Sequence, residues 1–204
     1  MFSKSKLAIL LSRLKDFERP NVKLEQYSTP SEIAAEVVYR AAELGDIKGK
    51  SILDPACGPG FLGIAALLLG AKKVNFLDAS KEAIALCREN VRSISKEYNI
   101  GKAEFTLSRI QDFSGKYDVV VQNPPFGTKI RHHDRDFLIK AFETASVVYS
   151  FHKVESRDFL YRISADNNFR ITHAWLFDFA LPASQKFHKR RIHRIRVGCW
   201  RFKK

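Results

Sequence analysis

The stretch Ser51-Ile52-Leu53-Asp54-Pro55-Ala56-Cys57-Gly58-Pro59-Gly60-Phe61 decides the fold of this chain of 204 residues. It predicts a short strand over 51–54, a turn rich in glycine and proline, and a buried helix over 61–69 that ends at Gly70. Glycines in such a turn let a ligand approach the backbone closely, and the helix behind it offers free N-terminal amides. By itself the stretch is weak evidence for a binding site, because similar turns also serve packing.

Downstream of this stretch, segments typical of strands and helices alternate. The pattern predicts strands over 73–77, 104–107, 117–122 and 147–151. It predicts helices over 81–96, 136–145 and 157–167. Such alternation indicates a mainly parallel sheet with helices on both faces. Two more β segments, 169–181 and 190–202, end the chain, so we expect an α/β fold whose mixed seven-stranded sheet has antiparallel last strands.

Upstream, apolar residues at helical spacing predict an amphipathic helix over 4–18, ended by Pro20. Thr29-Pro30 signals the start of a second helix. No repeat, low-complexity stretch or flexible linker interrupts the rest of the chain. We therefore describe residues 1–30 as an N-terminal helical arm and residues 31–204 as a single catalytic domain.

The chain carries 35 Lys and Arg against 22 Asp and Glu, a formal net charge of +13. A surface of that sign attracts polyanions such as RNA, although a solvated basic surface is common in small proteins. No acidic residue follows Asp178, so the excess is concentrated at one end. The basic residues of that end are Lys186, Lys189, Arg190, Arg191, Arg194, Arg196, Arg201, Lys203 and Lys204. We expect the segment 186–204 to contact nucleic-acid phosphates, with Arg194 and Arg196 on one face of the last strand.

The three cysteines lie far apart and show no CxxC spacing, which argues against a disulfide framework and against a structural zinc site. They are Cys57, Cys87 and Cys199. Cysteines without disulfide spacing favour a reducing, cytoplasmic location for the protein. The apolar runs at 7–11 and 62–71 are too short for a signal-peptide core or a bilayer span, so no membrane contact is expected. His132-His133-Asp134 falls in a polar loop predicted over 127–135, where solvated side chains are the simpler interpretation, and no metal site is expected.

Asp78 directly follows the strand predicted over 73–77. An acidic side chain at that place accepts hydrogen bonds from the ribose hydroxyls of a nucleoside cofactor bound across the first two strands. The alternative is that Asp78 caps the helix that starts near Ser80. The pattern GxGxxG, typical of pyrophosphate cofactors, is absent from the turn at 54–60. Turn and carboxylate together therefore favour a nucleoside cofactor without a pyrophosphate.

The motif Asn123-Pro124-Pro125-Phe126 follows the strand predicted over 117–122. Its prolines restrict the backbone and lack amide donors, so the carbonyl of Pro124 and the side-chain oxygen of Asn123 can both face one amine. Two acceptors suit an aromatic amino group such as N6 of adenine, because holding both hydrogens favours a more tetrahedral, more nucleophilic nitrogen. Phe126 would stack on the base, which must swing out of its own stack to reach the site. The alternative is a proline-rich turn with Phe126 packed in the core.

The order of glycine-rich turn, acidic residue and Asn-Pro-Pro-Phe resembles the class I (Rossmann-like), S-adenosylmethionine-dependent methyltransferases that act on planar nitrogen. More narrowly, four segments resemble the methyltransferase-like family of small-subunit ribosomal RNA N6-adenosine methyltransferases of archaea and eukaryotes. These segments are Leu24-Glu25-Gln26-Tyr27, Asn123-Pro124-Pro125-Phe126-Gly127-Thr128-Lys129, Val148-Tyr149-Ser150-Phe151-His152-Lys153 and Leu181-Pro182-Ala183-Ser184-Gln185-Lys186-Phe187-His188-Lys189. The resemblance runs from about residue 20 to the end. The four segments together are more specific than the four-residue motif alone, which glutamine and guanine N2 methylases share.

The resemblance implies S-adenosylmethionine as the methyl donor and assigns residues to two sites. In the donor site, Gln26 and Thr29 would close over the cofactor, Asp54 and Gly58 would line its methionine part, and Asp78 would hold its ribose. Gly60 and Ile110 complete the expected set of cofactor-binding residues. The catalytic site for the target amine would be Asn123, Pro124, Pro125 and Phe126.

The chain departs from this family at two places. Residues 54–57 read Asp-Pro-Ala-Cys where the family usually has Asp-Leu-Gly-Cys. Arg109 stands where the family commonly has an Asp that contacts the adenine of the cofactor.

Eukaryotic relatives also require a small zinc-binding activator subunit, which makes such a subunit a candidate partner here.

The function we expect is methyl transfer to N6 of an adenosine in small-subunit ribosomal RNA. One alternative is a glutamine N5-methyltransferase acting on a translation factor, although such enzymes usually carry a helical substrate-binding domain that residues 1–30 cannot build. The other is a non-catalytic RNA-binding subunit that has kept the fold. The intact Asn123, Pro124 and Phe126 oppose that second alternative, whereas Arg109 favours it.

Overall fold

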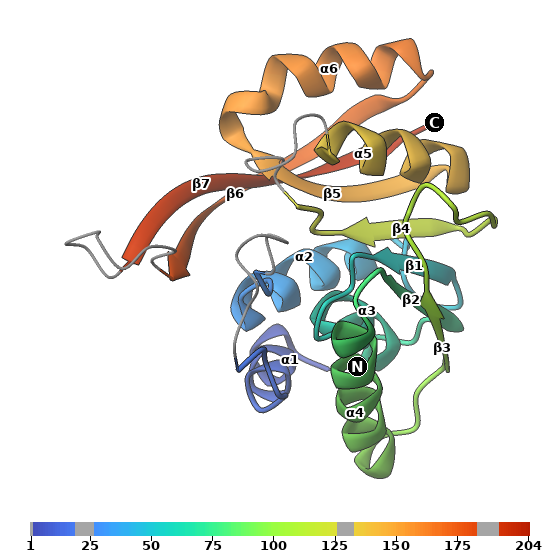
Figure 1. Ribbon diagram of the computed structural model, residues 1–204, viewed down its shortest axis with the longest axis vertical. Helices are drawn as coiled ribbons and strands as arrows, with labels where there is room; N and C mark the ends of the chain where they lie inside the picture. Colours follow the sequence, from blue (N-terminus) through green and yellow to red (C-terminus); the bar gives the residue numbers. More distant parts are fainter. Residues whose placement is uncertain (1, 19–26, 126–132, 183–191) are drawn as a thin grey trace.

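The computed structural model describes residues 2–18, 27–125, 133–182 and 192–204. These residues form one seven-stranded sheet in the order β3-β2-β1-β4-β5-β7-β6 (Figure 1). The strands are β1 (Ser51–Pro55), β2 (Lys73–Asp78), β3 (Lys102–Leu107), β4 (Val119–Gln122), β5 (Val147–Lys153), β6 (Arg170–Pro182) and β7 (Ile192–Lys203). Strands β1 to β5 pair in parallel, whereas β7 pairs antiparallel with both β5 and β6. The predicted mixed sheet is confirmed.

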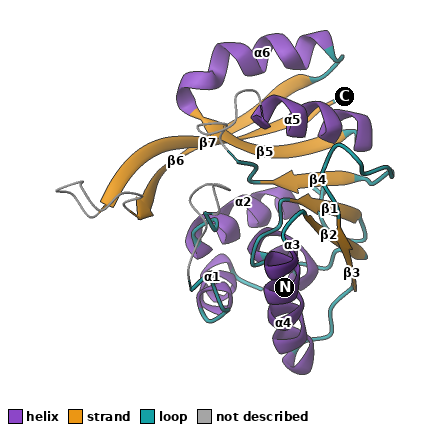
Figure 2. Ribbon diagram, viewed as in Figure 1, coloured by secondary structure: helices purple, strands orange, loops and turns teal. Residues whose placement is uncertain are grey.

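Helices cover both faces of this sheet (Figure 2). They are α1 (Lys4–Ser12), α2 (Ser31–Glu43), α3 (Phe61–Leu68), α4 (Lys81–Glu97), α5 (His133–Thr144), the short 3-10 helix η2 (Val154–Ser156) and α6 (Arg157–Asp166). Successive residues of a strand point to opposite faces. Ile52 therefore packs with α1 to α4, and Leu53 packs with α5 and α6. These two apolar layers are the main source of stability, because they remove the most apolar surface from water.

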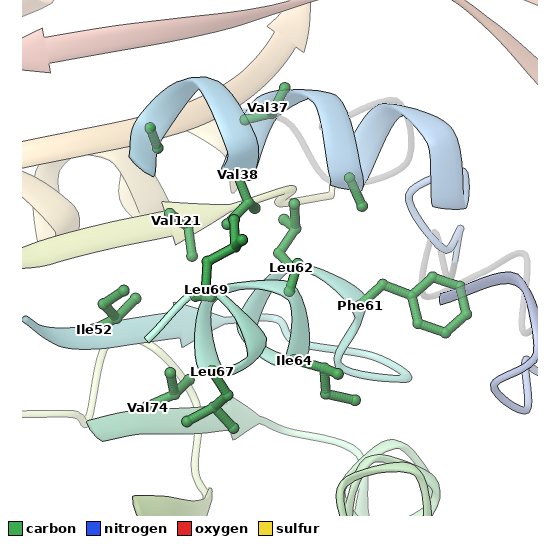
Figure 3. Close-up of a cluster of buried hydrophobic side chains, with 14 of the residues drawn as sticks. Val37, Val38, Ile52, Phe61, Leu62, Ile64, Leu67, Leu69, Val74 and Val121 are labelled. Carbon is green, nitrogen blue, oxygen red and sulfur yellow. The ribbon is translucent and has the colours of Figure 1, made fainter. Parts of the chain in front are cut away.

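Helix α3 is buried along its whole length between α2 and the sheet. Figure 3 shows Leu67 of this helix beside Val74 of β2, with Val38 of α2 on the other side. The buried helix predicted over 61–69 is confirmed. Because α3 starts directly behind the glycine-rich turn, its burial holds that turn at the C-terminal end of β1.

The first helix is shorter than predicted. Its Leu7 and Leu11 are buried in the core, but α1 ends at Ser12 and not at residue 18. Beyond it, the side chain of Asn90 in α4 bonds both the amide and the carbonyl of Lys15. A helix would use those backbone groups itself, so the tertiary contact replaces the helical one.

Helix α5 begins at His133, inside the polar loop predicted over 127–135, so that prediction was wrong for residues 133–135. Asp134 and Asp136 lie in its first turn, where acidic side chains favour a helix start. The remainder of the predicted loop lies outside the described residues.

The basic C-terminal segment follows its prediction only in part. Arg196 is exposed and Val197 is buried, as the alternation predicts. Arg201, however, is only 6% exposed and bonds Asp46 at 2.8 Å and the Tyr149 hydroxyl at 3.0 Å. A buried cation needs such pairing, so Arg201 belongs to the core and cannot contact phosphates. Residues 183–191 lie outside the described part of the chain, as do the side chains of 192–194.

No helix among the described residues combines the length and the apolar character that crossing a bilayer requires. The described part of the chain also holds no cluster of three or more His, Cys, Asp or Glu side chains arranged around a metal position. The three cysteines are all described and are buried free thiols.

Candidate active site

The candidate site lies where the C-terminal ends of β1, β2 and β4 meet. Two adjoining hollows are found there, and both are lined by Tyr27, Ala56, Gly58 and Asn123. The first hollow is further lined by Phe17, Asp78, Ala79, Ser80, Pro125 and Phe137. The second is further lined by residues that include Thr29, Asp54 and Cys57. The parallel strands thus bring together the glycine-rich turn, the predicted ribose carboxylate and the Asn-Pro-Pro motif.

The backbone of the glycine-rich turn is left-handed at three positions. Gly58 and Gly60 have φ angles of 52° and 90°, which glycine adopts without strain. A Cβ on Gly60 would lie 2.5 Å from Sγ of Cys87, so no larger residue fits there. Ala56 adopts φ of 55° with a side chain present, which is strained. Ala56 is the position at which the related family usually has glycine.

Asp54 anchors the turn from within. Its carboxylate is 1% exposed and accepts a 2.9 Å hydrogen bond from the amide of Gly63 in α3. Burial raises the pKa of Asp54 to about 8. The hydrogen bond from Gly63 acts in the opposite direction and lowers this pKa, whereas the nearby charge of Asp78 raises it further. Asp54 lines the second hollow, and its contact with Gly63 also fixes the start of the helix.

Asp78 links the turn to β2. Its carboxylate oxygens accept hydrogen bonds from the amides of Gly58 at 3.0 Å and Ser80 at 2.9 Å. Burial raises the pKa of Asp78. The cap of α4 is Ser80, whose hydroxyl accepts from the Ala83 amide, so Asp78 is not the N-cap. Each carboxylate oxygen has more than one acceptor site, which leaves capacity for further donors in the first hollow.

Asn123 faces the hollows from the end of β4. Its amide nitrogen donates a 3.0 Å hydrogen bond to the hydroxyl of Thr29. Its oxygen is buried, and no donor among the described residues bonds to it. A buried acceptor without a donor is unfavourable by about 1–3 kcal/mol, so this oxygen keeps the capacity to accept a hydrogen bond from a ligand. Pro124 is buried beside it and Pro125 is half-buried.

The other predicted site residues are placed less directly. Ile110 is buried in the cluster on the α5 side and is not among the residues that line either hollow. Arg109 is exposed and likewise does not line the hollows. Gln26 and Phe126 lie outside the described residues. A larger hollow between α1 and α3, lined by Phe2 and Leu68, contains no predicted site residue.

Sequence reasoning missed Phe17 and Phe137, which line the first hollow. Phe17 was assigned to the apolar face of a helix, and Phe137 lay in a helix without a functional motif. Neither has a local signal, because each reaches the site only through tertiary packing. The partnership of Thr29 with Asn123 was also missed, since Thr29 was assigned to the donor site alone.

Comparison with known proteins agrees with this geometry. Residues 34–148 match the family described as "Methyltransferase small domain". The chain is 35% identical to the rRNA N(6)-adenosine-methyltransferase METTL5 of Danio rerio, over 94% of both chains. It is 34% identical to the rRNA N(6)-adenosine-methyltransferase Mettl5 of Drosophila melanogaster, over 97% of this chain and 94% of that protein.

A solved structure extends the likeness to three dimensions. The crystal structure of PH1948 from Pyrococcus horikoshii, a candidate RNA methyltransferase, superposes with a TM-score of 0.91. The two chains are 41% identical, and the match covers 100% of this chain and 98% of that one. The chain therefore belongs to the methyltransferase small domain family, and so to the class I enzymes that use S-adenosylmethionine as methyl donor.

Proposed function

We propose that this protein transfers a methyl group from S-adenosylmethionine to N6 of an adenosine in small-subunit ribosomal RNA. The observation that carries the proposal is the buried oxygen of Asn123, which lacks a donor among the described residues while Thr29 occupies the amide nitrogen. That arrangement presents an acceptor at the site where an amine with two hydrogens would bind. The rRNA N6-adenosine methyltransferases named among the relatives support adenosine as that amine.

The residues present fit the donor. Asp78 lines the first hollow and keeps acceptor capacity for ribose hydroxyls, and Gly58, whose amide donates to Asp78, lines both hollows. Asp54, Gly60, Thr29, Gln26 and Ile110 complete the donor site that we propose. The bound donor supplies an electrophilic methyl group on a sulfonium centre.

The chain's own part in catalysis is positioning. Asn123 Oδ1 and the carbonyl of Pro124 would accept the two amine hydrogens, which orients the nitrogen lone pair toward the donor. Phe126 would stack on the base and hold its plane. No general base is needed, because an alkylated aromatic amine loses its proton readily.

RNA binding is proposed for the basic C-terminal segment. The exposed Arg196 on β7 and the acid-free sequence after Asp178 support phosphate contacts there. Such contacts position RNA without reading its sequence, so the adenosine would be selected at Asn123. Arg201 is excluded from this role by its burial.

A glutamine side chain is the alternative acceptor, because its amide nitrogen is also planar. One relative, named as a candidate protein N5-glutamine methyltransferase of Methanocaldococcus jannaschii, is 30% identical but matches only 53% of this chain. The RNA relatives match nearly the whole chain, so we favour RNA. A zinc-binding activator subunit and a cytoplasmic location stay predictions.

The test is incubation of the protein with labelled S-adenosylmethionine and unmodified small-subunit ribosomal RNA, followed by nucleoside mass spectrometry. We expect N6-methyladenosine with the wild type and its loss in Asn123→Ala, with donor binding retained by calorimetry. Asn99→Ala, at an exposed asparagine outside the site, is the matched control and should stay active. Label in protein or in guanosine would identify a different acceptor. Absence of donor binding by the wild type would identify a non-catalytic subunit.

A further inference from the structure

We infer that Phe17 of the N-terminal arm is a wall of the donor pocket, so that the arm is part of the S-adenosylmethionine site. The inference rests on the proposed function of the two hollows. Phe17 lines the first hollow together with Asp78 and Asn123. Its ring lies against the glycine-rich turn, because a Cβ on Gly58 would meet ring atom Cε2 at 3.4 Å, an ordinary contact distance.

The first contact that holds Phe17 in place is made by a buried side chain. Asn90 of α4, 2% exposed, accepts from the amide of Lys15 at 2.9 Å and donates to the carbonyl of Lys15 at 2.9 Å. The side-chain nitrogen of Asn90 also donates a 3.0 Å hydrogen bond to the carbonyl of Pro59 in the glycine-rich turn. Asn90 therefore joins the arm and the turn directly, and it holds the residue two positions before Phe17.

A second contact ties the arm to the segment that carries Thr29. The carboxylate of Asp16 accepts a 2.6 Å hydrogen bond from the hydroxyl of Ser28. Phe17 is thus held between two tethers, one to the turn through Lys15 and one to Ser28. The half-buried ring of Phe17 is therefore placed to cover a ligand bound in the first hollow. Its apolar face would exclude water from that ligand.

The ligand chemistry suits such a wall. Asp78 at the end of β2 gives the hollow an acceptor for ribose hydroxyls, and the ring of Phe17 supplies apolar surface from the arm. A nucleoside with an attached thioether or sulfonium chain has polar ribose hydroxyls and extended apolar surface, and a cation adds attraction to an aromatic face. Phe17 would therefore contribute affinity for the donor and not for RNA.

The experiment measures donor binding in Phe17→Ala against a matched arm variant, Phe2→Ala. Phe2 packs edge-on against Tyr98 at 5.3 Å and does not line the donor hollow. We expect Phe17→Ala to raise the Kd for S-adenosylmethionine and for S-adenosylhomocysteine about tenfold, while the KM for RNA is unchanged. Phe2→Ala should lower the Tm without changing either Kd.

A second variant keeps the test decisive if Phe17→Ala does not fold. Phe17→Trp places a fluorophore in the wall of the pocket. Titration with S-adenosylhomocysteine should change the emission of this variant more than that of the wild type, in which only Trp175 and Trp200 emit. An unchanged or tighter Kd in Phe17→Ala would overturn the inference, as would constant emission while calorimetry shows binding. If the wild type itself fails to bind the donor, the proposed function fails instead.

Discussion

The side-chain amide of Asn123 donates a 3.0 Å hydrogen bond to the hydroxyl of Thr29, which lies 94 positions earlier in the chain. This contact decides which end of the amide faces the hollows. With the nitrogen held by Thr29, the buried oxygen is the atom left for a ligand. An asparagine free to turn would present either end, so the threonine gives the Asn-Pro-Pro motif its polarity as an acceptor.

Replacing Thr29 tests this directly. Thr29→Val keeps the shape but removes the acceptor for the Asn123 amide, and Thr29→Ser keeps it. Loss of one such hydrogen bond corresponds to roughly 1 kcal/mol or more, so kcat should fall about tenfold in Thr29→Val and stay near wild type in Thr29→Ser. Steady-state kinetics with both substrates check this. A raised Kd for the donor with unchanged kcat would instead support Thr29 as a donor-site residue only.

The buried carboxyl of Asp54 predicts that stability falls as pH rises. The folded protein keeps its proton up to about pH 8, whereas the unfolded chain releases it near the ordinary value of 3.8. The folded state therefore binds more protons in that window, and the free energy of unfolding falls toward pH 8 and levels above it. Asp54→Asn retains an acceptor for the Gly63 amide and cannot ionise. Between pH 6.5 and 8 the difference between wild type and Asp54→Asn should change by about 2 kcal/mol, measured by urea unfolding. Parallel stability curves in that window would contradict the prediction.

His152 predicts the opposite dependence at acid pH. Burial lowers the pKa of His152 to about 3, so the unfolded chain takes up a proton below pH 6.5 that the folded protein does not. Its Nε2 lies 2.7 Å from the Ser150 hydroxyl, and Asp134 approaches its Nδ1 at 4.0 Å. The contribution of His152 to stability should therefore fall as pH falls from 6.5 toward 3, opposite to the contribution of Asp54 over the same range. Relative to wild type, His152→Gln should gain about 2 kcal/mol between pH 6.5 and 5, whatever its stability at neutral pH. Unfolding curves at the two pH values decide it, and a constant stability difference between His152→Gln and wild type would contradict the prediction.

Ala56 predicts a stabilising substitution inside the turn. Its φ of 55° is unfavourable for any residue with a Cβ. Ala56→Gly removes that strain, partly offset by the larger entropy of an unfolded glycine, so the free energy of unfolding should rise by about 0.5–1 kcal/mol. Thermal unfolding measures the effect. Ala79→Gly, at an exposed alanine of the same hollow without a left-handed φ, should not raise the Tm.

Local sequence was sufficient for most of the architecture. Each strand and α-helix of the domain was predicted within a few residues, because the alternation of short apolar runs and amphipathic stretches is a property of neighbouring residues; the 3-10 helix η2 was not predicted. The turn at 54–60 and the Asn-Pro-Pro motif were predicted as ligand-facing from local residue chemistry, since glycine permits a left-handed backbone and proline restricts the backbone wherever they occur. The parallel strands then had to bring both to one edge of the sheet.

Contacts between distant residues were decided only by the tertiary structure. Lys15 leaves the helical pattern because Asn90, 75 positions later, takes its backbone groups. Arg201 reads as a solvated cation in its sequence context, yet Asp46 and Tyr149 bury it. A side chain's hydrogen-bond partner and its access to water depend on which elements pack together, and no local spacing encodes that. The sequence by itself therefore determined the sheet, the turn and the Asn-Pro-Pro motif, and only folding decided that Phe17 lines the hollow and that Thr29 accepts a hydrogen bond from the Asn123 amide.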